Sequence, residues 1–183
     1  MTLCRASAAG AGARPVDNGQ MSLRWKPSVT VAAVIERESR FLLVEEETPE
    51  GLRLNNPAGH LDPGESPAEG CAREALEETA HRFTPTALVG VYLSRHRQPD
   101  TGTDVTYLRL AFCGALGPQE PGRALDTGIV RTVWMTPQEV RASASRHRSP
   151  LVLACMEDYL AGRRLPLETV FTDPSVYGPA TDA

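Results

Sequence analysis

The chain has 183 residues, of which 41% are hydrophobic and 23% are charged, as expected for one globular domain with a real core. Its formal net charge of −4 argues against general nucleic-acid binding, which favours a basic surface. The sequence has no apolar run close to the roughly 18 residues that a membrane-spanning helix needs. We therefore expect neither a nucleic-acid nor a membrane partner.

Cysteine usage indicates a reducing compartment. Cys4, Cys71, Cys113 and Cys155 are widely spaced and form no C-x-x-C motif, which favours buried, reduced thiols in a cytoplasmic protein over disulfides or a zinc site. The histidines also lack metal-ligand spacing, and we expect ordinary surface or loop residues at His60, His81, His96 and His147.

Domain boundaries follow from composition. Residues 1–20 are rich in Ala, Gly and Arg, with no acidic residue before Asp17, and such a segment cannot build a core. Residues 1–24 are therefore predicted to be a disordered extension, or a misassigned one if the natural start is Met21. An organellar transit peptide is the third alternative, although Gly and Pro weaken an amphipathic helix there. Residues 25–170 would form the domain, and residues 171–183 a flexible tail.

The first half of the domain begins with buried strands. Residues 29–36 (VTVAAVIE) and 41–44 (FLLV) are apolar runs rich in β-branched or aliphatic side chains, separated by a short polar turn. Residues 45–56 hold an acidic stretch and a turn. Residues 57–65 are predicted to be an irregular loop, because Gly and Pro are frequent there.

A helix is predicted directly after this loop. Ser66 suits the N-cap, Pro67 suits the first helical position, and Glu69 completes a capping box. One buried stripe is expected from the helical spacing of Ala68, Ala72, Ala75, Leu76 and Thr79. Three glutamates, Glu74, Glu77 and Glu78, would then lie on the opposite face.

Strands and helices follow in the second half. Residues 87–93, 107–115 and 129–135 are expected to be strands, the first two joined by a loop at 98–103. Thr136 and Pro137 open a short helix to about residue 144, and Ser149 and Pro150 open another to about residue 160, with Gly162 as its stop signal. This order predicts an α/β fold with a mixed sheet between helices.

The acidic helix carries the main functional signal. Glu74 and Glu78 are four residues apart and stack on one face, where like charges destabilise an isolated helix by roughly 0.2–0.5 kcal/mol. A divalent cation such as Mg²⁺ would explain that arrangement, because it binds carboxylates and phosphate oxygens. The alternative is an ordinary solvated face, on which Arg73 pairs with Glu69 and Glu77.

The spacing of six residues decides between these readings. Gly59, Glu65, Arg73, Glu74, Glu77 and Glu78 form the pattern G-x5-E-x7-R-E-x-x-E-E. This pattern resembles the Nudix box of hydrolases that act on nucleoside-diphosphate-linked compounds. The resemblance implies a Nudix-type α/β/α sandwich with a mixed β-sheet. The family's pattern continues with an arbitrary residue, a glycine and an aliphatic residue, but Ala80 and His81 stand at the last two positions here.

The resemblance also implies roles for the box residues. Glu74 and Glu78 would be catalytic and would bind Mg²⁺, or alternatively Mn²⁺, together with Glu77 and the carbonyl of Ala58. Gly59, Glu65 and Arg73 would be structural, with Arg73 orienting the carboxylates. The family varies in its general base and sometimes takes it from a loop outside the box. Asp126 is the preferred candidate here and Glu120 the alternative; either could instead be a solvated loop acid.

Substrate contacts are expected on one strand. Tyr107 and Arg109 share a face of residues 107–115, and a strand-borne arginine can pair with a diphosphate. A surface position for Arg109 is the alternative reading. Residues 95–97 (RHR) form a small basic cluster that would attract phosphate or simply be solvated.

Several further segments, namely Lys26-Pro27, residues 29–34 (VTVAAV), 44–48 (VEEET), 57–62 (PAGHLD) and 148–152 (RSPLV), resemble the broad-specificity phosphatases of the NudJ type within this family. This resemblance extends over roughly residues 25–170. It implies hydrolysis of nucleoside tri- and diphosphates, or of thiamine-type pyrophosphates, by a monomer or homodimer with a small-molecule substrate. The alternatives are hydrolysis of nucleotide sugars or dinucleotides, and a non-catalytic nucleotide-binding module. Leu54 stands where this subgroup commonly has a tryptophan, so substrate preference is less firmly indicated than reaction type.

Overall fold

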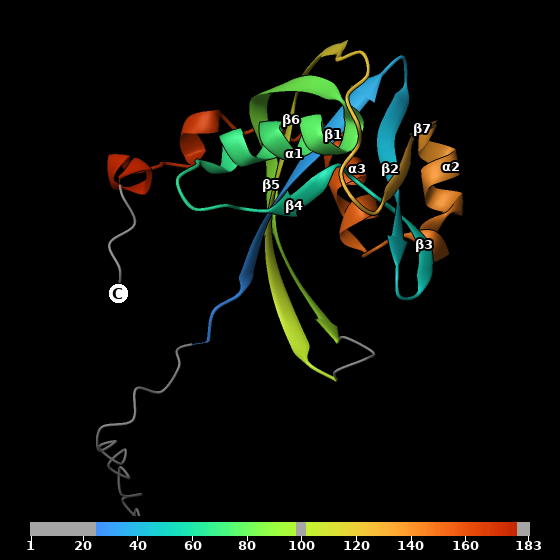
Figure 1. Cartoon of the computed structure of the whole chain (residues 1–183), viewed down its shortest axis with the longest axis horizontal. Coiled ribbons are helices and arrows are strands. Elements are labelled where there is room, and N and C mark those ends of the chain that lie inside the picture. Colours follow the sequence, from blue (N-terminus) through green and yellow to red (C-terminus); the bar gives the residue numbers. More distant parts are fainter. Residues whose placement is uncertain (1–24, 98–101, 179–183) are drawn as a thin grey trace, which may run out of the picture.

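The computed structural model describes residues 25–97 and 102–178 (Figure 1). The proposed N-terminal extension, residues 98–101 of the expected loop and residues 179–183 lie outside this part of the chain. The β-strands are β1 (Ser28–Arg37), β2 (Arg40–Thr48), β3 (Gly51–Asn55), β4 (Ala58–His60), β5 (His81–Arg97), β6 (Asp104–Gln119) and β7 (Ile129–Met135). The α-helices are α1 (Pro67–Thr79), α2 (Pro137–Ala142) and α3 (Leu151–Leu160), and the 3-10 helices are η1 (Ala144–Arg146), η2 (Leu167–Thr169) and η3 (Pro174–Tyr177).

The strands form one mixed sheet. Its main order is β3-β2-β1-β6-β5, with β4 paired to β1 and β7 paired to β2. The β1–β6 pair is parallel, whereas the other pairs are antiparallel. β1 sits at the centre because its apolar residues are buried on both faces of the sheet. The predicted mixed sheet is confirmed.

β1 changes partner along its length. Its last residues, 35–37, pair with β2, whereas residues 30–32 pair with β4. The amide of Ala33 continues this contact by donating to the carbonyl of Pro57 at 2.8 Å. The prediction of an irregular loop over residues 57–65 was therefore wrong for residues 58–60. Strand pairing uses the main chain, so a neighbouring strand can order a segment whose composition favours a loop.

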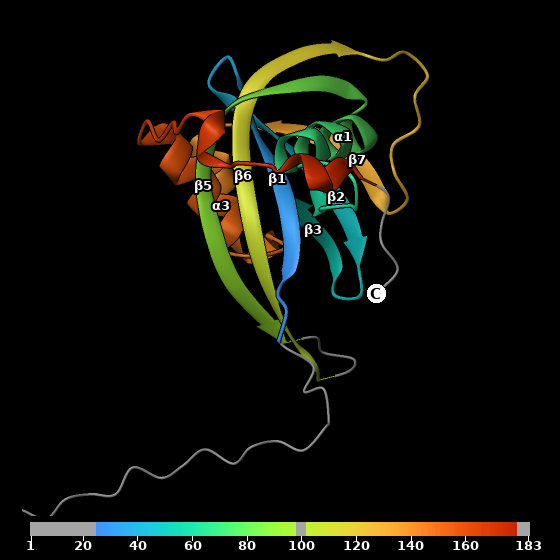
Figure 2. The ribbon, with the colours of Figure 1, turned by 90° about the vertical axis from the view of Figure 1, so that its left-hand side faces the viewer.

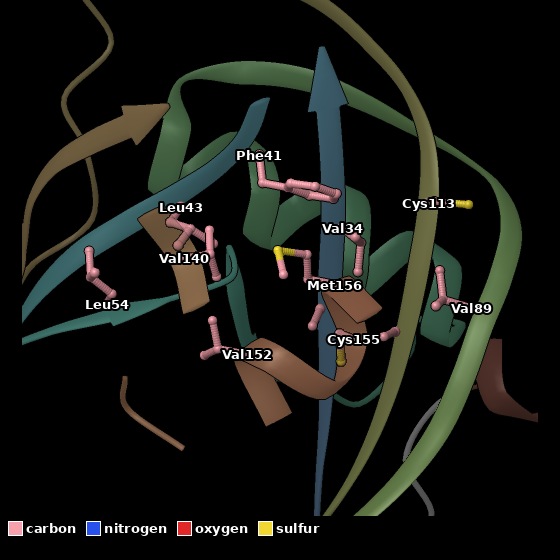
Figure 3. Close-up of a cluster of buried hydrophobic side chains, with 12 residues drawn as sticks. Val34, Phe41, Leu43, Leu54, Val89, Cys113, Val140, Val152, Cys155 and Met156 are labelled. Atoms are coloured by element: carbon pink, nitrogen blue, oxygen red, sulfur yellow. The ribbon is translucent and has the colours of Figure 1, made fainter. Parts of the chain in front are cut away.

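Two hydrophobic clusters lie on opposite faces of the sheet. Alternating residues of β1 supply both, since Ala32 and Val34 belong to one cluster and Val31, Ala33 and Ile35 to the other. Figure 2 shows α1 and α3 on opposite sides of the strands. Figure 3 shows the α3-side cluster, in which side chains of β1, β2 and α3 converge. This layering confirms the expected α/β/α sandwich.

Most elements lie where the sequence predicts them, but two strands are much longer. β5 and β6 have 17 and 16 residues, and their pairing continues far beyond the predicted segments 87–93 and 107–115. Both form a long two-stranded extension (Figure 1). The ends next to the connecting loop, residues 94–97 and 104–107, lack an apolar signal and are held by pairing between the two strands. β7 coincides with its predicted range, and Gly162 has the positive φ of 82° expected of a helix stop.

Three cysteines, Cys71, Cys113 and Cys155, are free and buried, as predicted for them; Cys4 lies outside the described residues. Within residues 25–97 and 102–178, the helices are all too short or too polar to cross a membrane.

Candidate functional site

Helix α1 starts as the sequence predicts. The hydroxyl of Ser66 accepts from the amide of Glu69 at 3.2 Å, and the Glu69 carboxylate accepts from the amide of Ser66 at 2.8 Å. Pro67 occupies the first helical position. This reciprocal cap determines where the helix begins, and therefore which of its later side chains reach β4.

The buried face of α1 differs from the prediction. Ala75 and Thr79 are buried, but Ala68, Ala72 and Leu76 are only partly so. Glu74 and Glu78 are 8% and 6% exposed, so they do not lie on a solvated face opposite the stripe. The prediction assigned the apolar side chains to the interior. In the structure, the helix is rotated so that two of its carboxylates pack toward the loop and β4.

β4 receives both buried carboxylates. The carboxyl group of Glu74 lies directly over Gly59, where an added Cβ would come within 2.2 Å of it. The Glu78 carboxylate accepts a hydrogen bond from the amide of Ala58 at 2.8 Å. Only glycine at position 59 permits this approach, so the motif's glycine and its first helical glutamate are in direct contact.

Arg73 connects the loop with the helix. Its guanidinium donates two hydrogen bonds to Glu65, at 2.8 and 3.0 Å, and one to the carbonyl of His60 at 3.0 Å. Its Nη1 also donates to Glu74 at 2.7 Å and to Glu77 at 3.1 Å. The motif residues expected to be structural are thus brought together, and Arg73 neutralises part of their charge.

Burial disfavours the negatively charged forms of Glu74 and Glu78. Desolvation raises the pKa of Glu74, an effect that Arg73 opposes. For Glu78, desolvation together with the nearby charges of Glu74, Glu46 and Asp126 raises the pKa to about 8, despite the amide of Ala58. Glu78 is therefore the carboxylate with the least compensation for its negative charge.

The two candidate loop acids have different surroundings. The amide of Asp126 donates to the carbonyl of Glu77 at 2.9 Å, and its charge acts on both Glu74 and Glu78. Glu120 instead pairs with Arg82 at 2.7 Å and with Arg123 at 3.1 Å. Asp126 is exposed and is joined to the acidic helix, whereas the carboxylate of Glu120 is taken up by two arginines.

The acids offer oxygen ligands for a divalent cation, but they do not form a ready-made cluster. Within the described ranges, no three Asp, Glu, His or Cys side chains are grouped as a metal site requires. Glu74 and Glu77 both contact Arg73, while Glu78 contacts Ala58. Their chemistry nevertheless fits such an ion, because buried carboxylate oxygens are hard ligands and Glu78 lacks a cationic partner among the described residues.

A cavity of about 220 Å³ opens on the other side of β4, with Ala58, Gly59 and His60 in its wall. Tyr107 and Arg109 both line it, so the predicted shared face is observed. Arg109 is only 7% exposed, which rules out the surface reading. His60 and His96 also line the cavity, and both are exposed, as expected of surface residues. Leu54, which stands where the NudJ-type subgroup commonly has a tryptophan, is buried in the α3-side core.

Several cavity residues were missed by sequence reasoning. They come from β1, β2, β3, β5 and the segment before α3, and they are Thr30, Glu46, Asn55, Ser94, Arg148 and Ser149. Only the resemblance at residues 148–150 gave a signal for two of them. The others are brought together by strand register, for example by Thr30 lying opposite Arg109, which sequence spacing does not reveal.

Comparisons with known proteins agree with this geometry. Residues 25–154, more than half of the chain, match the model of the NUDIX domain. Phosphatase NudJ of Escherichia coli K12 is 36% identical over 146 residues, covering 80% of this chain and 92% of that protein. A solved NUDIX hydrolase from Nitrosomonas europaea is 51% identical, with a TM-score of 0.73, covering 81% of this chain and 98% of that one.

A solved MutT protein from Methanosarcina mazei Go1 shares the fold at 20% identity and a TM-score of 0.59, covering 78% of this chain and all of that one. The family model and the relative at 36% identity define the class of this chain as a hydrolase with a NUDIX domain. The chain belongs to the Nudix hydrolase family.

Replacing Gly59 by alanine should disrupt the site selectively. The new methyl group would meet the Glu74 carboxyl group at 2.2 Å, so Glu74 must leave its position on β4. We expect a loss of hydrolytic turnover of at least about tenfold, since misplacement of a site group by about 1 Å can cost 10²-fold. Turnover and far-ultraviolet circular dichroism of the same preparation check this, and a folded variant with parental turnover would contradict it.

Glu78 should also make stability depend on pH when metal is chelated with EDTA. Its pKa in the folded protein is about 8, above the ordinary value of 4.5, so folding favours the protonated form. The stability that this group contributes is present below pH 4.5 and is lost as the pH rises toward 8. Glu78→Gln should therefore be more stable than the parent at pH 8, with the difference vanishing near pH 4.5. Urea unfolding across this range measures it; equal stabilities at pH 8 would contradict it.

Proposed function

We propose that this hydrolase cleaves phosphoanhydride bonds in nucleoside tri- and diphosphates or thiamine-type pyrophosphates, with water attacking phosphorus and with Mg²⁺, or alternatively Mn²⁺, as cofactor. The observation that carries the proposal is the burial of Glu74 and Glu78 against β4, whose opposite side borders the cavity. Support also comes from the relatives, which are phosphatases by name. The free, buried thiols accord with a cytoplasmic location.

The cation would be held by Glu74 and Glu78, with Glu77 and the carbonyl of Ala58 as further ligands. When bound, it would neutralise charge that develops on the phosphoryl oxygens and make a bound water more acidic. Glu74 and Glu78 are the residues whose own electrostatics favour such binding, because desolvation penalises their charge. Arg73 contributes by holding Glu74 and Glu77 in position through Nη1.

Asp126 is proposed as the general base that accepts a proton from the attacking water. Its main chain is hydrogen-bonded to the last turn of α1, which keeps it close to the helix without burying its carboxylate. The exposed carboxylate of Asp126 is accessible to water, whereas Glu74 and Glu78 are buried and are better placed to hold a cation. The environments of these acids therefore separate their proposed roles.

Hydrolysis should require both the cation and Glu78. We expect hydrolysis of a nucleoside triphosphate and of thiamine pyrophosphate, measured as release of phosphate or pyrophosphate, and of ADP-ribose, measured as formation of AMP, to stop in EDTA and to return with Mg²⁺. Glu78→Gln keeps the size and the acceptor for Ala58 but removes the charge, so turnover should fall by about 10²–10⁴-fold.

Glu69→Gln is the matched control for this test. It makes the same chemical change on the same helix, and glutamine can retain the capping box, so turnover should stay near parental. Equal turnover in Glu78→Gln and the parent would count against the assigned site. Metal-independent release from every substrate would count against the proposed chemistry.

The two loop acids can be separated by a second pair of variants. Asp126→Asn should reduce turnover by about 10²-fold or more, because general-base catalysis typically contributes about 10²–10⁴-fold. Glu120→Gln should change it little, since that carboxylate contacts Arg82 and Arg123. The reverse ranking of the two variants would assign the base to Glu120.

A further inference from the structure

The sheet has one long edge, along which the described chain pairs at a single position. β5 is the last strand in the sheet order (Figure 2). On its outer side, the main chain of Leu88 exchanges hydrogen bonds of 2.9 and 2.8 Å with Leu165. Residues 90–97 lie beyond this contact, and within residues 25–97 and 102–178 they pair with β6 alone. Such an edge presents N–H and C=O groups that can pair with another chain.

Exposed apolar side chains lie along the same edge. Val91 and Leu93 are 56% and 65% exposed, and they point to one face of the sheet because they are two residues apart on a strand. Their cross-strand neighbours are Leu110 and Leu108, and Leu110 belongs to the core cluster on the α1 side of the sheet. The apolar face of the extension is therefore continuous with the core.

Two other strands, β3 and β7, also pair along one side and are less suited to association. β3 has five residues and a single large apolar side chain that is exposed, Leu52 at 45%. β7 has seven residues and likewise one, Val130 at 47%. The outer side of β5 thus combines the greater free length with the larger apolar surface.

We propose that residues 90–96 of β5 pair antiparallel with the same residues of a second copy of this chain, so that one sheet runs through a homodimer. A two-fold axis at Leu93 places this residue opposite its own copy and places Val91 opposite Arg95 of the second copy. The exposed apolar side chains of both copies then lie on one face across the junction. Apolar cross-strand pairs of this kind stabilise a sheet.

The charges along β5 agree with this register. Arg95 pairs with Asp104 on β6, so its charge is compensated within one copy while its alkyl stem can cover Val91 of the other. His96 falls opposite Gly90. An axis at Arg95 or at His96 would instead bring arginines opposite each other, and like charges in that position are destabilising.

An axis at Ser94 is the remaining alternative that keeps like charges apart. It would place Leu93 opposite Arg95 of the second copy and Ser94 opposite itself. The axis at Leu93 is favoured because it brings together the two most exposed apolar side chains of the edge.

Analytical ultracentrifugation of the full chain at micromolar concentrations tests the interface. We expect a particle of twice the chain mass of 19.8 kDa. Leu93→Lys should raise the dissociation constant of the dimer at least about tenfold, because it replaces an apolar pair by two like charges across the axis. Leu93 is exposed, so the variant should fold, and far-ultraviolet circular dichroism verifies this.

Leu52→Lys and Val130→Lys are the matched controls, since each makes a comparable change on another edge strand. Both should keep the parental dissociation constant. A monomeric parent, or an equal loss in Leu93→Lys and the controls, would overturn the interface. The measurement needs neither substrate nor cation, so its outcome is independent of the proposed function.

Cross-linking tests the register, in a Cys4→Ser background that leaves the three buried cysteines. Directly opposed residues of antiparallel strands have Cα atoms about 4.5–5.5 Å apart, within reach of a disulfide. Leu93→Cys should therefore form a disulfide-linked dimer under mild oxidation. Ser94→Cys, opposite Tyr92 of the second copy, should do so much more slowly, as should Val130→Cys on β7. Faster linkage of Ser94→Cys would overturn the register, and equal linkage of Leu93→Cys and Val130→Cys would overturn the interface.

Discussion

Two carboxylates buried between a helix and a short strand are the constraint on which the site depends. Transfer of a carboxylate from water into a protein interior costs several kcal/mol unless a cation or hydrogen bonds compensate it. Arg73 compensates Glu74, whereas among the residues that the structure describes Glu78 has the amide of Ala58 as its one hydrogen-bond donor. The motif therefore places charge where the fold alone does not satisfy it, which is the condition under which a bound cation stabilises a protein.

β4 connects the carboxylates with the cavity. Gly59 lies against Glu74, Ala58 donates to Glu78, and the carbonyl of His60 accepts from Arg73. The same three residues form part of the cavity wall. This position exists because β1 pairs with β2 at one end and with β4 at the other. A three-residue strand thereby connects the proposed cation site with the cavity.

Local signals predicted the elements that depend on local interactions. The cap at Ser66 and Glu69 was predictable because both partners lie within one helical turn. β1 and β7 were predictable because their composition favours strands. β4 was not, because its order comes from pairing with β1, and the loop composition of residues 57–65 pointed the other way. The extended ends of β5 and β6 were missed for the same reason.

The candidate site was predictable only in part. The spacing of the motif places Glu74 and Glu78 on successive turns of one helix, with Arg73 next to Glu74, whatever the helix packs against. The burial of Glu74 and Glu78 was predicted incorrectly. The prediction placed the apolar side chains of the helix in the interior, whereas at this site two charged side chains are buried. Thr30, Glu46 and Asn55 were not found, because they meet Arg109 only through the pairing of strands distant in sequence.

By itself, the sequence determined the helix, its cap and the set of acids, because these depend on neighbours within a few residues. Tertiary structure decided which acids are buried, where β4 lies and which side chains surround Arg109. Those features depend on contacts between distant segments, whose geometry is set by strand register and helix rotation.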